Sequence, residues 1–215
     1  EEAKNAAQAG TVSSEQSQQT IVAANTDKGD VKGSTFAGFK LKTTPRNTSM
    51  KLSWSKVKGA EGYFVYGAAC GQKMKCLGKV TGNKKSYTVK KLKKGTYYKY
   101  MLTAYKTIYG EKRIIATSVS AHCTTKGGKY GNPTAVVFEK KTVSVKKKKT
   151  FKLKPELKCD KKMKTHIAKF RYESSNPSIA TVNKSGKIKG KKKGKCDIYI
   201  YAQNGLYKKI KVTVK

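Results

Sequence analysis

The residues best suited to chemistry in this chain are five cysteines and two histidines. No CxxC or CxxH spacing occurs, so the sequence carries neither a zinc nor a redox signature. Nucleophilic catalysis requires a thiol or hydroxyl beside a positioned base. His122 directly precedes Cys123 near the end of a predicted strand, where adjacent side chains point to opposite faces. We therefore expect no catalytic dyad there, and no metal site at His166, which lies in a charged connection without suitable partners.

Two cysteines have a spacing suited to a cross-link. Cys70 and Cys76 flank the residues GQKMK between two predicted antiparallel strands, so they could face each other at the end of a hairpin. We predict a disulfide between them in the oxidised protein. Cys123 has no candidate partner, and we expect it to be buried and unreactive.

The acidic residues and glycines do not support an enzyme. Glycoside hydrolysis needs two carboxyl groups held in one cleft. The glycine-rich stretch KGGKYGNP is not followed by a predicted helix, as a phosphate-binding loop would be. We predict a non-catalytic protein without cofactor or metal. The acids after residue 34 are scattered and mostly beside lysines: Glu61, Glu111, Glu139, Glu156, Asp160, Glu173 and Asp197.

Lysine dominates the charge of the chain. There are 49 Lys plus Arg against 12 Asp plus Glu, a net charge of +37, and only three of the 49 are arginines. The net charge is −2 over residues 1–34, +18 over residues 35–128 and +21 over residues 129–215. Because base readout and bidentate phosphate binding favour arginine, this composition favours nonspecific attraction to polyanions over specific nucleic-acid binding. The alternative is a solvated surface without a ligand.

Two short lysine runs crowd two predicted turns in the second half of the chain. We predict that they bind an anionic cell-wall polymer or an acidic host glycan through broad faces instead of one pocket. The predicted site residues are Lys146, Lys147, Lys148, Lys149, Lys191, Lys192 and Lys193.

Hydrophobic periodicity predicts an all-β chain. Alternating runs such as MKLSW and KIKVTVK are typical of half-buried strands, and no segment has a helical period over ten residues or the roughly 18 apolar residues of a membrane span. Residues 1–34 lack aromatic residues and are predicted to be a flexible tether. We predict two tandem domains over residues 35–126 and 134–215, joined by a Gly-rich linker at residues 127–133.

Alternation is clearest in the second half. Residues 151–159 place Phe, Leu, Pro, Leu and Cys on one face and lysines on the other, and residues 196–202 repeat the pattern with Cys, Ile, Ile and Ala inward. Asn204-Gly205 predicts a hairpin between the last two strands with a type I′ turn, whose central residues both need positive φ.

Tyrosines on the final hairpin form another candidate feature. Tyr199 and Tyr201 are predicted to point outward among lysines. Such rings either stack on sugars or bases, or cover neighbouring tyrosine and lysine side chains across the strands. The sequence leaves both interpretations open.

The first domain resembles fibronectin type III domains. The resemblance rests on LSWSKVKGAEGYFVYG and YTVKKLKKGTYYKYMLTAY, with Trp54 on an early strand, Tyr63 opening the third, and Leu92-x-x-Gly95-x-x-Tyr98 before a long alternating strand. It implies an antiparallel sandwich in which Tyr98 is the corner tyrosine that ties a strand end to nearby backbone.

The second domain resembles bacterial Ig-like domains of group 2. The resemblance rests on SSNPSIATV, SGKIKGKKKGKCDIYIYA and the closing KIKVTVK, which match the family's layout. It implies a small immunoglobulin-like β-sandwich in a secreted or surface protein, as in gut Firmicutes. It also implies that the strands ending at Cys159 and beginning at Cys196 are antiparallel neighbours, so that the two thiols would meet in a disulfide. The alternative is two buried thiols acting as small apolar groups.

Together these features predict a secreted or cell-surface protein that acts by non-catalytic adhesion or display. The alternative is a structural spacer without a specific ligand. A monomer is expected, because strong like charge disfavours close self-association.

Overall fold

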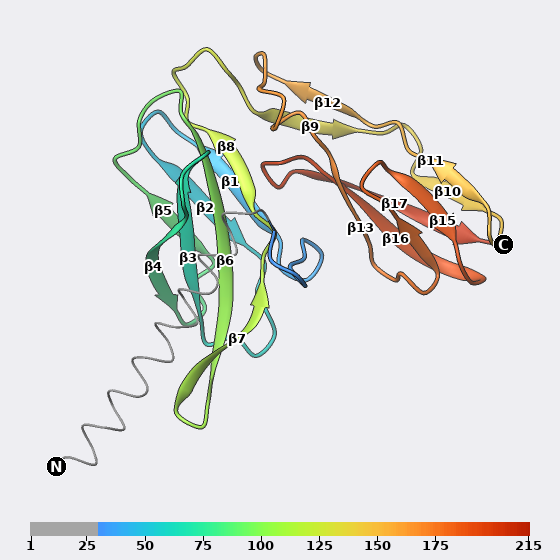
Figure 1. Ribbon diagram of the computed structural model, residues 1–215, viewed down its shortest axis with the longest axis horizontal. Coiled ribbons are helices and arrows are strands. Elements are labelled where there is room, and N and C mark those ends of the chain that lie inside the picture. Colours follow the sequence, from blue (N-terminus) through green and yellow to red (C-terminus); the bar gives the residue numbers. More distant parts are fainter. Residues whose placement is uncertain (1–29) are drawn as a thin grey trace. The chain divides into compact units, whose positions relative to one another are not determined.

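The computed structural model describes residues 30–215, which belong to two compact units (Figure 1). The described part of the chain divides into residues 30–125 and residues 126–215. All regular structure in the described part is β-strand, so the all-β prediction is confirmed. No helix in this part is long and apolar enough to cross a membrane.

Asp30 and Val31, the first described residues, contact the rest of the first unit. The Asp30 carboxylate accepts a hydrogen bond from the Ser120 backbone N–H (2.8 Å), and Val31 packs against a cluster of buried aromatic and methionine side chains. These two contacts lie inside the segment predicted to be a tether, and local composition does not reveal such long-range contacts. Residues 1–29 of that segment lie outside the described residues.

The first unit is built from two antiparallel sheets. The smaller has the order β1-β2-β5, formed by β1 (Leu41–Pro45), β2 (Met50–Trp54) and β5 (Ser86–Val89). The larger has the order β4-β3-β6-β7, formed by β3 (Gly62–Ala69), β4 (Lys75–Thr81), β6 (Tyr97–Ile108) and β7 (Glu111–Thr117), with β8 (Ala121–Thr124) also paired to β6.

The long strand β6 has two successive partners on one side. Its first four residues pair with β8, and its later part pairs with β7. Between these two ladders, the Ser118 hydroxyl accepts a hydrogen bond from the Leu102 backbone N–H (2.9 Å), which satisfies a buried donor where strand pairing is interrupted. The arrangement places β8 beside the first part of β6.

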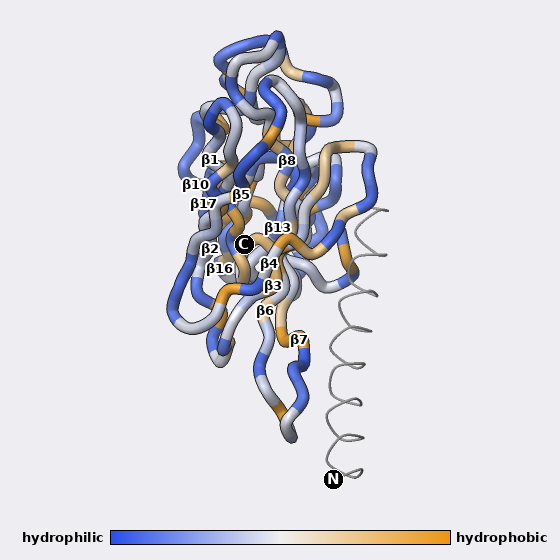
Figure 2. Tube along the Cα trace, turned by 90° about the vertical axis from the view of Figure 1, so that its left-hand side faces the viewer, coloured by the Kyte–Doolittle hydropathy of each residue, from blue (hydrophilic) through white to orange (hydrophobic). Residues whose placement is uncertain are grey.

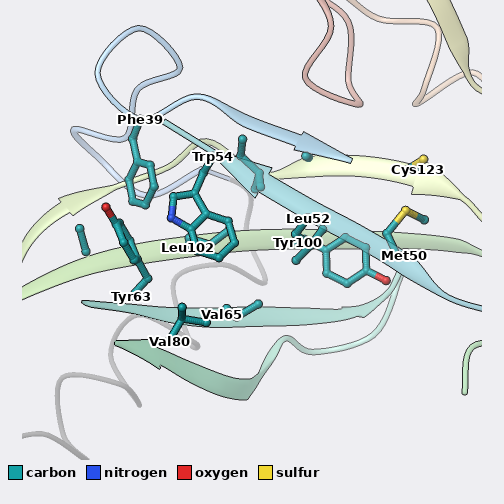
Figure 3. Packing of buried hydrophobic residues seen from close by; sticks show 13 residues of the cluster. Phe39, Met50, Leu52, Trp54, Tyr63, Val65, Val80, Tyr100, Leu102 and Cys123 are labelled. Carbon is teal, nitrogen blue, oxygen red and sulfur yellow. The ribbon is translucent and has the colours of Figure 1, made fainter. Parts of the chain in front are cut away.

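The core of the first unit follows the predicted strand phase. Met50, Leu52 and Trp54 on β2 are all buried, as their alternation predicted. Figure 3 shows these side chains between the two sheets. The Trp54 and Tyr63 rings pack edge-on, with 5.3 Å between their centroids. Tyr98 takes the predicted corner position, since its hydroxyl accepts a hydrogen bond from the Lys93 backbone N–H (3.0 Å).

The second unit contains three sheets. Its largest has the order β10-β17-β16-β13, formed by β10 (Thr142–Val145), β13 (Arg171–Ser174), β16 (Gly194–Tyr201) and β17 (Tyr207–Val214). A second has the order β11-β15-β14, formed by β11 (Thr150–Lys152), β14 (Ala180–Val182) and β15 (Lys187–Gly190). The third pairs β9 (Pro133–Val137) with β12 (Glu156–Cys159). Figure 2 shows hydrophobic segments along the strands and largely hydrophilic connections.

The segment over residues 151–159 is not the single strand that its alternation predicted. It forms β11, paired with β15, and β12, paired with β9, with a break of three residues between them. Pro155 lies in the break and has no N–H to continue a ladder. Leu153 is buried, whereas Cys159 is exposed, so the predicted inward phase is wrong at the end of this segment.

The hairpin between β16 and β17 is confirmed, but its turn type is not. Gly205 has φ of 90°, whereas Asn204 has a negative φ, and a type I′ turn requires positive φ at both. The Gly205 N–H instead donates to the Ala202 carbonyl (3.1 Å). The Asn204 side-chain amide donates to the Pro133 carbonyl (2.8 Å), so a tertiary contact competes with the turn that the two residues would adopt alone.

The Tyr98 corner provides a test of the first unit. We expect Tyr98→Phe to lower its free energy of unfolding by about 1 kcal/mol, because the variant loses one hydrogen bond to the backbone. The single tryptophan, Trp54, lies in this core, so its fluorescence in a urea titration reports the transition. Tyr109→Phe is the matched control, because the Tyr109 side chain is 98% exposed and should leave the midpoint unchanged. Equal midpoints for all three proteins would contradict the expected role of Tyr98.

Candidate functional site

The two predicted lysine turns meet in the second unit although they lie far apart in the sequence. Residues 146–149 connect β10 to β11, and residues 191–193 connect β15 to β16. The Lys148 N–H donates to the Gly190 carbonyl (2.9 Å), and the Gly190 N–H donates to the Lys149 carbonyl (3.1 Å). Residues 146–149 and 191–193, together with Lys215, are called the lysine end below.

The last strand fixes the first of these turns from its other side. The Lys147 N–H donates to the carbonyl of Lys215 (2.9 Å), and the Lys215 N–H donates to that of Val145 (3.1 Å). A further bond from the Lys149 N–H to the Lys146 carbonyl (3.0 Å) closes the turn. The parallel ladder between β10 and β17 therefore continues into the lysine end and orders its backbone.

Two backbone features show that the two lysine turns lie close together. Lys148 has φ of 66°, a left-handed conformation that is uncommon for residues other than glycine. Gly190 leaves no room for a side chain, since a Cβ there would lie 2.9 Å from the Lys146 carbonyl oxygen. Larger residues at position 190 would push the two turns apart.

The lysine end is strongly cationic and open to solvent. Its eight lysines are all exposed. None of them forms an ion pair with a carboxylate in the part of the chain that the structure describes. Because each ammonium is a solvated point charge, the arrangement can attract anions without imposing a fixed geometry on them. The range of that attraction is about 8 Å at physiological ionic strength.

The tyrosines of the final hairpin pack on one another. Tyr201 lies 5.8 Å from Tyr199 and 5.4 Å from Tyr207 between ring centroids. Tyr201 is 1% exposed, so its predicted outward exposure is wrong, while Tyr207 is 43% exposed. Burial raises the pKa of the Tyr201 hydroxyl well above its usual range. The geometry fits the interpretation in which neighbouring rings cover one another across the strands.

The first predicted disulfide is not formed. Cys76 lies opposite Tyr66 in the β3–β4 ladder, whereas Cys70 follows β3 and its Sγ lies 3.6 Å from Nδ1 of His122. Cys123 is buried as predicted, on the opposite face of β8 from His122. The contact between Cys70 and His122 could not be predicted from the sequence, because no local pattern shows that β8 and the end of β3 flank the same part of β6.

The second predicted disulfide is also not formed. Cys159 lies opposite Pro133 in the β9–β12 sheet, and Cys196 lies opposite Val212 in the β16–β17 ladder. The implied neighbour relation between their strands is therefore wrong. All five cysteines of the chain are described and are thiols.

Family models match both units in chain order. The fibronectin type III domain matches residues 34–119, and the bacterial Ig-like domain of group 2 matches residues 133–214. The chain therefore carries a fibronectin type III domain followed by a bacterial Ig-like domain, as its motifs predicted. Both are non-catalytic domain types typical of extracellular proteins.

Solved structures that match the chain include single fibronectin domains. The FN3tt crystal structure is 28% identical, covering 42% of this chain and 91% of its own, with a TM-score of 0.32. The FN5 domain of Drosophila Lar is 22% identical, covering 41% and 92%, with a TM-score of 0.33. The fn3 domain of human contactin 1 is 16% identical, covering 46% and 78%, with a TM-score of 0.36. No curated protein matches this chain.

The different positions of Cys159 and Cys196 lead to a testable difference in reactivity. Burial raises the pKa of the Cys196 thiol, whereas Cys159 is exposed. Since the thiolate is the reacting species, we expect iodoacetamide at pH 8 to modify Cys159 at least about tenfold faster. Peptide-resolved mass spectrometry measures both rates, and denaturant should make them equal. A linked Cys159–Cys196 peptide from the unreduced native protein would contradict the expected outcome.

Proposed function

We propose that this chain is a secreted or cell-surface module that holds a linear anionic polymer on the lysine end of its second domain. The observation that carries the proposal is the pair of backbone hydrogen bonds through Gly190, which joins two lysine turns into one cationic surface. The polymer is an anionic cell-wall polymer or an acidic glycan. The extracellular character of both domain types is consistent with either source.

A polymer suits this surface better than a small anion. The lysines project from exposed turns, and an exposed ion pair contributes only about 0.2–1 kcal/mol. Useful affinity therefore requires a ligand that contacts several lysines at once, so that later contacts form within the same complex. The ordered backbone lowers the entropy lost on binding, because only the side chains remain to be fixed.

The lysine end lacks the groups that read nucleic-acid sequence. It contains neither arginine nor an aromatic residue, so bidentate base contacts and base stacking have no side chains to supply them. The stacked tyrosines of the final hairpin are largely occupied with one another. Selectivity would therefore come from the charge spacing and stiffness of the polymer.

Removal of the predicted lysine charges tests the site. We expect replacement by Gln of the seven lysines at positions 146–149 and 191–193 to weaken teichoic acid or heparin binding at least about tenfold at 0.15 M NaCl, because several ion pairs are lost together. Biolayer interferometry with each immobilised polymer, repeated from 0.05 to 0.3 M NaCl, gives the affinities and their salt dependence.

The matched control removes seven charges from exposed lysines of the first domain. It should retain most of the binding, although both variants have the same net charge. Equal losses in the two variants would contradict a localised site and support a spacer with generic charge. DNA and a neutral glycan are tested in the same way as teichoic acid and heparin. The polymer that stays bound best at high salt shows whether the ligand is a cell-wall polymer or an acidic glycan. The control positions are Lys56, Lys58, Lys84, Lys85, Lys90, Lys93 and Lys94.

A further inference from the structure

Three segments bring a thiol and an imidazole together in the first domain. β6 pairs with β3 on one side and β8 on the other, so Lys99 lies opposite both Ala68 and His122. Residues directly opposite in a ladder share a face, and Cys70 follows Ala68 by two positions. The result is a contact of 3.6 Å between Cys70 Sγ and His122 Nδ1.

The surroundings of this pair suit an ionised thiol. Cys70 and His122 are both half-buried, so part of the bulk water is excluded from the pair. Lys99 contributes a cation to the same face and is only 9% exposed. On this face β6 also carries the titratable groups Tyr97 and Tyr105, and β3 carries Tyr66. Tyr100 and Cys123 lie on the opposite, core-facing side. Thiolates form most readily next to histidine and lysine in partly exposed positions of this kind.

We propose that Cys70 is an activated thiol that exchanges with small disulfides, with His122 as its proton acceptor. The Cys70 proton passes to His122, and the thiolate attacks one sulfur of the incoming disulfide. A mixed disulfide forms on Cys70 as the original S–S bond breaks, and the departing thiolate takes the proton from His122. No net oxidant is consumed, because one disulfide replaces another.

The other cysteines do not share this arrangement. Cys76 is exposed, and its Sγ contacts the Gly78 carbonyl at 3.7 Å. Cys159 is exposed in the second domain, and Cys123 and Cys196 are buried. Cys76 is therefore a reference thiol in the same domain, with greater solvent exposure than Cys70.

Wild-type reactivity provides the first test. The reduced full chain is treated with 2,2′-dipyridyl disulfide at pH 6, and the rate at each cysteine is read from peptide-resolved mass spectrometry. We expect Cys70 to react about fivefold faster than Cys76 or more, because an ordinary thiol is only about 0.3% ionised at that pH. From pH 8 to pH 6 the Cys76 rate should fall about tenfold per unit, and the Cys70 rate should fall less steeply.

The His122→Gln variant provides the second test. We expect its Cys70 rate to drop below that of Cys76, while the Cys76 rate stays at the wild-type value. Trp54 fluorescence checks that the first domain remains folded. A wild-type Cys70 rate below that of Cys76, parallel pH profiles for the two thiols, or an unchanged Cys70 rate in the folded variant would each overturn the proposal. The comparison of the Cys70 and Cys76 rates in the wild-type protein tests the proposal even if the His122→Gln variant does not fold.

Discussion

The parallel pairing of β10 with β17 is the interaction on which the lysine end depends. It is the only parallel ladder among the described strands, and it aligns Val145 with Val214, both buried. The same ladder continues through Lys215 to Lys147, so strand pairing sets the position of the first lysine turn. Full burial of a valine side chain stabilises the folded state by about 1.5–3 kcal/mol. Repulsion between two exposed lysines in water destabilises it by only a few tenths of a kcal/mol, on the order of other exposed charge interactions. The core can therefore hold like charges together.

This balance links the stability of the second domain to its proposed function. Crowded ammonium groups disfavour the folded state slightly, and an anionic polymer that binds only that state relieves the repulsion and adds to its stability. The bonds through Gly190 make the surface part of the folded domain instead of two independent loops. In the first domain, strand pairing brings another pair of residues together: the pairing of β8 with β6 places His122 beside Cys70.

Strand phase could be predicted wherever alternation reflected burial on one face. Trp54, Ile198 and Ile210 are buried as their positions predicted, because the period of two in a strand is a local property of the backbone. The prediction failed at Cys159, since Pro155 interrupts the ladder and the chain changes partner there. It also failed for Tyr201, because periodicity indicates which side of a strand a residue takes but not what covers that side.

The sequence by itself determined the two domain types, most of the strand phases and the concentration of lysine in two turns, because motifs, alternation and charge are all local. Only the tertiary structure decided that these turns share one end, that Cys70 meets His122 and that Cys159 and Cys196 lie in different sheets. The reason is that strand partners are selected by the total burial and hydrogen bonding of segments distant in the chain. A change of partner moves every side chain on the strand, while the sequence pattern remains the same.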